Sequence, residues 1–197
     1  MKTILLDNGH GGVLNGVYQT SGKRSPMWND GTILYEGEYN RAIVNGVMEE
    51  LTRLEIPYVN IAPELTDTSL TERVKRANKI DNSVYVSIHS NAGPASAHGF
   101  ELFTYHGESD SDKYATIFAR KFQEEFPTVK FRSDYSDGDI DKESSFYVLR
   151  HTNMPAVLLE NFFMTNEHEC REYLMSSHGR KRVVRYIIEA IKEIVFI

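Results

Sequence analysis

The stretch VYVSIHSN at residues 84–91 decides the fold of this chain, because a β-branched and aromatic run there turns abruptly polar. Two runs resemble it, ILLDNGHGG at residues 4–12 and AVLLEN at residues 156–161. Short apolar runs of this kind are typical of buried strands in a mostly parallel sheet. Ligands of open α/β sheets bind beyond the carboxyl ends of the strands. We therefore expect the polar residues that end the three runs to meet at one sheet edge.

Helical spacing fills the sequence between these runs. Apolar residues recur every three or four positions over 36–54, 114–126 and 178–195. Further strands are expected at 58–61, 100–105 and 146–149, a helix from a capping box at 69–72 to about residue 80, and a helix at about 166–175. The pattern predicts an α/β fold: one three-layer domain over residues 1–197, with a mostly parallel, twisted sheet of about six strands flanked by helices. No separate second domain is expected.

Several local features carry weaker expectations. Residues 13–33 are polar and glycine-rich, and we interpret them as one long loop, which is often functional at that length. Asp110 or Ser111 is expected to cap the following helix. The acidic stretch 134–141 is interpreted as a solvated loop, with a calcium site as the alternative, although the EF-hand pattern is absent.

Bulk composition excludes several classes of protein. The net charge of −6 argues against nucleic-acid binding, and the single Cys170 excludes an intrachain disulfide. No run approaches the roughly 18 apolar residues that a membrane span needs, so no membrane insertion is expected. The N-terminal apolar stretch is too short for a signal peptide. The sequence thus predicts synthesis in the cytoplasm.

The polar residues at the three strand ends suggest a catalytic metal site. A hydrolytic zinc keeps three protein ligands, commonly histidine and glutamate, and one open position. His10, His89 and Glu160 follow the apolar runs, and Glu36 and Glu38 lie at the start of a helix. Spacing alone leaves open whether Glu36 or Glu38 takes part, and which glutamate is a ligand and which a base.

Five blocks of the chain together resemble the zinc-dependent N-acetylmuramoyl-L-alanine amidases. They are DNGHGG at 7–12, EGEYN at 36–40, SIHSNA at 87–92, GFE at 99–101, and YVLR with PAVLLE and FMTN at 147–166. The blocks follow the order of that family and span nearly the whole chain. Two departures are a longer insert at 22–28, which resembles phage-type enzymes, and the pair Asn161-Phe162 in place of small residues.

The resemblance implies a mechanism and a substrate. One zinc per chain would be bound by His10, Glu36 and His89, with Glu160 as the catalytic base and then acid. The substrate would be peptidoglycan, cut at the amide between N-acetylmuramic acid and L-alanine of the stem peptide. Asn91 and Arg150 are candidate substrate-binding residues. The enzyme would act on the bacterial cell wall after phage lysis or non-classical export.

Two other classes of function compete with this interpretation. One is a different zinc hydrolase on the same scaffold, such as a peptidase or deacetylase. The other is a non-catalytic peptidoglycan-binding module, which would bind the wall without turnover. The sequence does not specify the oligomeric state.

Overall fold

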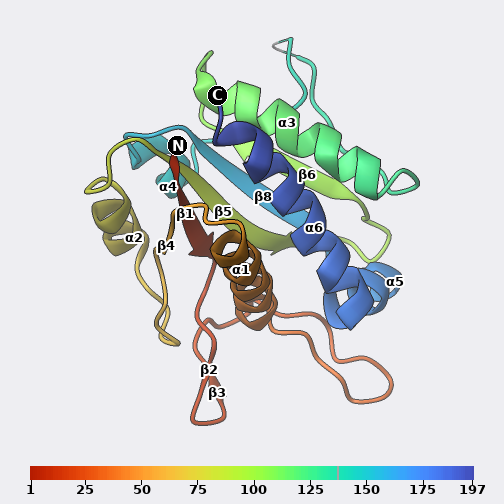
Figure 1. Cartoon of the computed structure of the whole chain (residues 1–197). Coiled ribbons are helices and arrows are strands. Elements are labelled where there is room, and N and C mark those ends of the chain that lie inside the picture. The colour runs from red at the N-terminus through yellow and green to blue at the C-terminus, as the bar shows by residue number, and fades with distance from the viewer. Residues whose placement is uncertain (137) are drawn as a thin grey trace.

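A computed structural model of the chain describes residues 1–136 and 138–197. Its centre is a six-stranded sheet in the order β4-β1-β5-β8-β6-β7 (Figure 1). Every neighbouring pair is parallel except β6 and β8, which are antiparallel. The predicted fold class is therefore confirmed. The strands are β1 (Thr3–Asn8), β4 (Tyr58–Asn60), β5 (Ser83–Asn91), β6 (Phe100–Thr104), β7 (Lys142–Glu143) and β8 (Ala156–Phe163).

Helices cover both faces of the sheet and produce the predicted three layers (Figure 1). One face packs against α1 (Glu36–Arg53), α3 (Asp110–Glu125) and α6 (Ser177–Ile194) in the larger hydrophobic cluster. The other face packs against α2 (Leu70–Ala77) and α4 (Tyr147–His151) in a smaller cluster. Among the described residues, no helix has the length and apolar character to cross a membrane.

Alternate residues along the central strands pack into the two hydrophobic clusters on opposite faces of the sheet. Leu5, Tyr85 and Leu158 belong to the smaller cluster, whereas their chain neighbours belong to the larger one. Successive side chains of a strand point to opposite faces. Asp7, Ser87 and Glu160 therefore lie on the same face as α2 and α4. This smaller layer leaves the carboxyl end of the central strands open.

Two strands are longer than predicted. The sequence suggested ends near residues 88 and 159, but β5 continues to Asn91 and β8 to Phe163. The reason is pairing: His89 is in register with Glu160, and Glu160 is in register with Glu101 of β6. Ladder hydrogen bonds thus hold these polar residues inside strands, and a bulge between His89 and Asn91 ends the regular pairing.

The segment predicted as a strand at 146–149 is instead the short helix α4. Arg150 N donates to Phe146 O at 2.9 Å, and Thr152 Oγ1 donates to Val148 O at 2.7 Å at the end of the helix. Val148 and Leu149 are buried in the smaller cluster. An apolar run this short is compatible with either element, and here packing against α2 decides for the helix.

Smaller differences concern the ends of elements and loops. The predicted loop at 13–33 contains a two-stranded hairpin of β2 (Val13–Leu14) and β3 (Val17–Tyr18). Helix α3 is capped by Ser109, in a capping box with Asp112, rather than by Asp110 or Ser111. The helix expected near 166–175 divides into α5 (Glu167–Glu169) and the π-helix η1 (Cys170–Met175). In the acidic stretch 134–141, Asp137 lies outside the described residues.

Candidate metal centre

Three of the predicted side chains converge at the carboxyl end of the sheet. His10 follows β1, Glu36 is the first residue of α1, and His89 lies in β5. One ligand atom from each lies within 4.8 Å of the others. Glu36 Oε1 is 3.2 Å from His10 Nε2 and 3.1 Å from His89 Nδ1. The two imidazole rings stand at 87° to each other with centroids 5.1 Å apart, so both face the same small volume.

The backbone around His10 is shaped to bring these groups together. His10 has a φ of 68°, in the left-handed region that costs energy for a non-glycine residue. A Cβ on Gly9 would lie 2.0 Å from the ring of His89, and one on Gly37 would lie 1.8 Å from Gly11 O. Glycine is therefore required at both close approaches. Asn40 Nδ2 donates to Gly9 O at 2.9 Å and fixes α1 against this turn.

The structure distinguishes the two candidate glutamates of α1. Glu36 is 2% exposed and sits between the histidines. Glu38 Oε1 instead accepts a hydrogen bond from Val13 N at 2.7 Å, and so holds the hairpin segment. Burial alone would raise the pKa of Glu36, but His10 and His89 lower it well below its ordinary value. Glu36 is thus an anion that can serve as a ligand.

This donor set fits a zinc ion. Two imidazoles and a carboxylate are zinc ligands in hydrolytic sites that keep one open position. Within the described part of the chain, the buried Nε2 of His10 has no hydrogen-bond partner, although Glu36 Oε1 is only 3.2 Å away. An orphaned nitrogen directed toward a buried carboxylate is the arrangement expected around a shared cation.

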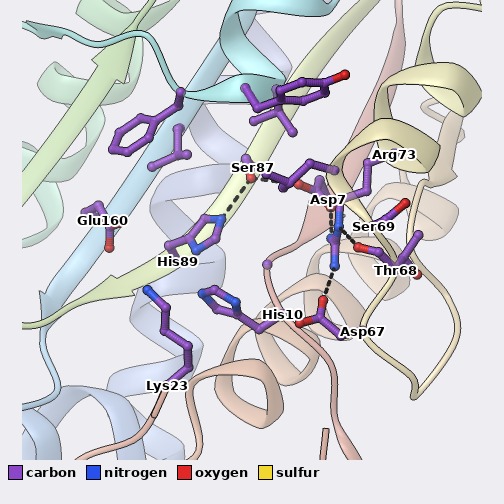
Figure 2. Close-up of a pocket in the computed structure, with 16 residues that line it drawn as sticks. Asp7, His10, Lys23, Asp67, Thr68, Ser69, Arg73, Ser87, His89 and Glu160 are labelled. Carbon is purple, nitrogen blue, oxygen red and sulfur yellow. Dashed lines mark hydrogen bonds and ion pairs between the residues drawn. The ribbon is translucent and has the colours of Figure 1, made fainter. Parts of the chain in front are cut away.

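Glu160 faces this cluster from the neighbouring strand β8. It is in register with His89, and its Oε2 is buried without a hydrogen-bond partner among residues 1–136 and 138–197. Burial is the main reason that the pKa of Glu160 is raised to about 8, with His89 opposing and Glu36 adding to the shift. Figure 2 shows the carboxyl group pointing toward the space beside His89 and Lys23. Such a group holds a proton readily.

Two hollows flank the cluster and share Lys23 and Glu160. The larger, about 570 Å³, is bordered by α2 and α4 and includes Leu70, Phe146 and Tyr147 (Figure 2). The smaller, about 420 Å³, lies toward the β5–β8 bulge and includes Asn91. An extended substrate can therefore pass across the cluster from one hollow to the other.

The two candidate substrate-binding residues occupy different positions. Asn91 borders the smaller hollow, and its Nδ2 donates to Glu101 Oε2 at 2.6 Å. Arg150 is exposed on α4 and is not among the residues that border the larger hollow, whereas Tyr147 and Val148 are. A substrate-binding role for either residue stays a prediction.

The sequence suggested Asp7 as a residue that steers a local turn or supports a metal ligand, but it did not suggest Arg73 behind it. Arg73 of α2 is 2% exposed and pairs with Asp7, donates to Asn8 O at 2.8 Å, and approaches Asp67 Oδ1 at 3.4 Å. Burial would raise the pKa of Asp7, but Arg73 lowers it below its usual range. One signal was available: Arg73 adjoins Val74 on the apolar face of a short amphipathic helix, where an arginine must find an anion.

Comparison with known proteins agrees with this geometry. The family described as N-acetylmuramoyl-L-alanine amidase (Amidase_3) matches residues 4–193. An uncharacterized cell wall amidase of Bacillus anthracis is 30% identical over 196 residues, covering 96% of this chain and 35% of that protein. The N-acetylmuramoyl-L-alanine amidase CwlM of Bacillus licheniformis is 32% identical, covering 94% and 65% respectively. The chain thus spans less than two thirds of these two relatives.

A solved structure matches over almost its full length. The catalytic domain of CwlV, an N-acetylmuramoyl-L-alanine amidase from Bacillus (Paenibacillus) polymyxa var. colistinus, superposes with a TM-score of 0.77 and 26% identity. The match covers 99% of this chain and 98% of that domain. The similarity therefore extends over all the layers described above.

Proposed function

Because the chain belongs to the Amidase_3 family of N-acetylmuramoyl-L-alanine amidases, we propose that it hydrolyses the amide between N-acetylmuramic acid and L-alanine of peptidoglycan. One zinc per chain is held by His10, Glu36 and His89 in this proposal. The observation that carries it is the convergence of their three ligand atoms beside Glu160, whose buried Oε2 has no hydrogen-bond partner among the described residues. Residues 1–197 act as one catalytic domain with no separate wall-binding domain within them.

Held by His10, Glu36 and His89, a zinc ion would supply Lewis-acid chemistry, polarising the substrate carbonyl and lowering the pKa of water. Glu160 takes a proton from the water that attacks the carbonyl carbon. As the C–N bond breaks, Glu160 delivers that proton to the nitrogen of L-alanine, which leaves as an amine. Burial raises the pKa of Glu160 in the metal-free chain, and a bound cation beside it would favour the carboxylate, which is the form that accepts the proton from water. Lys23 lies beside Glu160 in both hollows and also lowers that pKa.

In this proposal the substrate binds in the two hollows beside the cluster. The larger one, with its aromatic and aliphatic border on α4 and α2, accommodates one side of the scissile amide, and the polar smaller one accommodates the other. In this proposal Asn91 contacts the muramyl peptide in the smaller hollow, and Arg150 contacts it outside the border of the larger one. The proposed site of action is the bacterial cell wall, reached on release from the cell in which the chain is made.

Digestion of purified peptidoglycan tests the reaction. The expected products are new L-alanine amino groups on the stem peptides without new sugar reducing ends. Cleavage between stem-peptide residues or release of acetate would instead support another zinc hydrolase. Binding to peptidoglycan without any product would support the non-catalytic module.

Metal analysis tests the site separately. We expect about one zinc per purified chain and its loss in His10→Ala. Glu38→Gln is the matched control on the same helix turn, since Glu38 contacts Val13 rather than the cluster. Equal zinc loss in both variants would contradict the ligand assignment.

A further inference from the structure

A line of polar groups runs from His89 away from the cluster, along the border of the larger hollow, to Arg73 on α2 (Figure 2). His89 Nε2 is 3.2 Å from Ser87 Oγ, and Ser87 Oγ donates to Asp7 Oδ2 at 2.8 Å. Asp7 Oδ1 is paired with Arg73. Ser87 is wholly buried, and Asp7 and Arg73 are nearly so, at 1% and 2% exposed. Water therefore has little access to this line, and its hydrogen bonds must be satisfied internally.

The charges at the far end determine the direction of every hydrogen bond in the line. Asp7 pairs with a buried guanidinium and is a carboxylate, which can only accept. Ser87 has a single hydroxyl proton and donates it to Asp7. The oxygen of Ser87 can then meet His89 only as an acceptor. His89 must carry its proton on Nε2, which leaves the lone pair on Nδ1.

That lone pair lies on the side of the cluster. His89 Nδ1 is 3.1 Å from Glu36 Oε1, whereas Nε2 faces Ser87 Oγ. We propose that Asp7 and Ser87 are positioning residues that fix the tautomer of His89, so that it binds the metal through Nδ1. This inference rests on the metal site of the proposed function and adds how one ligand is prepared for it.

Arg73 connects the same line to the segment that holds the other histidine. Its Nη2 approaches Asp67 Oδ1, and Asp67 Oδ2 accepts from Thr20 Oγ1 at 2.6 Å. Thr20 Oγ1 in turn accepts from Gly11 N at 2.8 Å, directly after His10. One guanidinium on α2 therefore supports the surroundings of both histidines, and Figure 2 shows it between Asp7 and Asp67.

Zinc affinity of the metal-free chain, measured by competition with a chromophoric chelator, tests the proposal without using activity. In Asp7→Asn the amide can donate to Ser87 Oγ, so the serine proton becomes free to point at His89 and favour the wrong tautomer. We expect affinity to fall roughly 10- to 100-fold in Asp7→Asn and in Ser87→Ala, as for other outer contacts of metal ligands. Ser83→Ala on the same strand is the control, since Ser83 Oγ donates to Ile80 O, outside the line from His89 to Arg73.

The nitrogen NMR shifts of His89 in the zinc-loaded wild-type protein give a second readout that a purely structural role would not move. We expect a protonated Nε2 and a metal-bound Nδ1. Coordination through Nε2, or unchanged zinc affinity in folded Asp7→Asn and Ser87→Ala, would overturn the proposal. If a variant does not fold, the wild-type spectrum still decides. A wild-type chain that binds no zinc would instead refute the metal site of the proposed function.

Discussion

Glu101 of β6 and Glu160 of β8 are partners in register, but their side chains have very different hydrogen-bond partners. Glu101 accepts from Arg132 Nε at 2.6 Å, from Lys142 Nζ at 2.7 Å and from Asn91 Nδ2 at 2.6 Å. These partners outweigh burial and lower its pKa. Glu160, its partner in register, has a buried oxygen with no donor within the described residues and a pKa raised to about 8.

The difference separates a carboxylate held by ion pairs from the carboxyl group that the proposed function uses for proton transfer, and both lie on the same sheet. Glu101 connects three segments of the chain, and its charge is neutralised by fixed cations. Among the described residues no cation forms an ion pair with Glu160, and although His89 and Lys23 lower its pKa, burial keeps its proton affinity high. A buried carboxyl without partners is costly for folding. We infer that this cost is tolerated because it leaves Glu160 free to move a proton.

The largest effect is expected from replacing Glu160, and it concerns turnover. Glu160→Gln keeps the shape of the side chain but removes its ability to accept a proton. We expect turnover of peptidoglycan to fall by about 10²- to 10⁴-fold, the usual contribution of general acid–base catalysis. Zinc content should stay near wild type. An active Glu160→Gln enzyme would remove Glu160 from the mechanism.

In the metal-free protein, the pH dependence of stability should reveal the raised pKa that distinguishes Glu160 from Glu101. The folded chain keeps the proton on Glu160 up to about pH 8, whereas the unfolded chain releases it near the ordinary pKa of 4.5. Stability is therefore expected to fall as pH rises between these values, by at most about 1.4 kcal/mol per pH unit for one proton. Asp141, with its pKa raised mainly by burial to about 7, contributes in part of the same window.

Urea unfolding at several pH values isolates the share of Glu160. The wild-type chain should lose more stability than Glu160→Gln between pH 5 and 8, since the amide has no proton to lose. Parallel curves for the two proteins would show that Glu160 is not perturbed in the folded state.

Replacing Glu101 should have a moderate effect on the free energy of unfolding. Glu101→Gln leaves Arg132 and Lys142 facing a neutral group, although both side chains reach solvent in part. We expect a loss of about 1–3 kcal/mol in unfolding free energy, the usual range for a hydrogen-bonded group that loses its partner. Urea titration measures it, and Glu124→Gln on the exposed face of α3 is the control. A wild-type stability would mean that the three contacts contribute nothing net.

The smallest effect is expected from Lys23, a cation that borders both hollows together with Glu160. Lys23 lowers the pKa of Glu160, but it does so from an exposed position on a loop. Lys23→Met should move the acidic limb of the pH–rate profile to higher pH by a fraction of a unit, with little change at the optimum. Arg24→Met, on the adjacent residue, is the control. A shift of the limb to lower pH would contradict the assignment.

The sequence predicted much of this architecture because burial patterns are local. The runs at 4–6, 84–88 and 156–159 are apolar on both faces, and that alone predicts central strands. The residues that end those runs then gave the position of the cluster. The short helix α4 could not be predicted, because four apolar residues do not distinguish a strand from a helical turn and α2 decides between them.

Contacts between distant segments explain the rest of what was missed. Glu36 and Glu38 lie two residues apart at a helix start, and only the position of Val13 N shows what Glu38 does. The line from His89 to Arg73 joins residues from three elements, and no spacing in the sequence connects them. The resemblance to the amidase family, confirmed by the match over residues 4–193, supplied what spacing could not.

The position of β8 between β5 and β6 has a consequence for the order of events during synthesis. Residues 83–104 leave the ribosome long before residues 156–163, yet the sheet has a gap until β8 inserts between the two earlier strands. Pairings between segments so distant in sequence form late and slowly. Glu160 arrives with that last strand. A nascent or truncated chain would therefore present both histidines before it gains the glutamate to which the proposed function assigns the proton transfer.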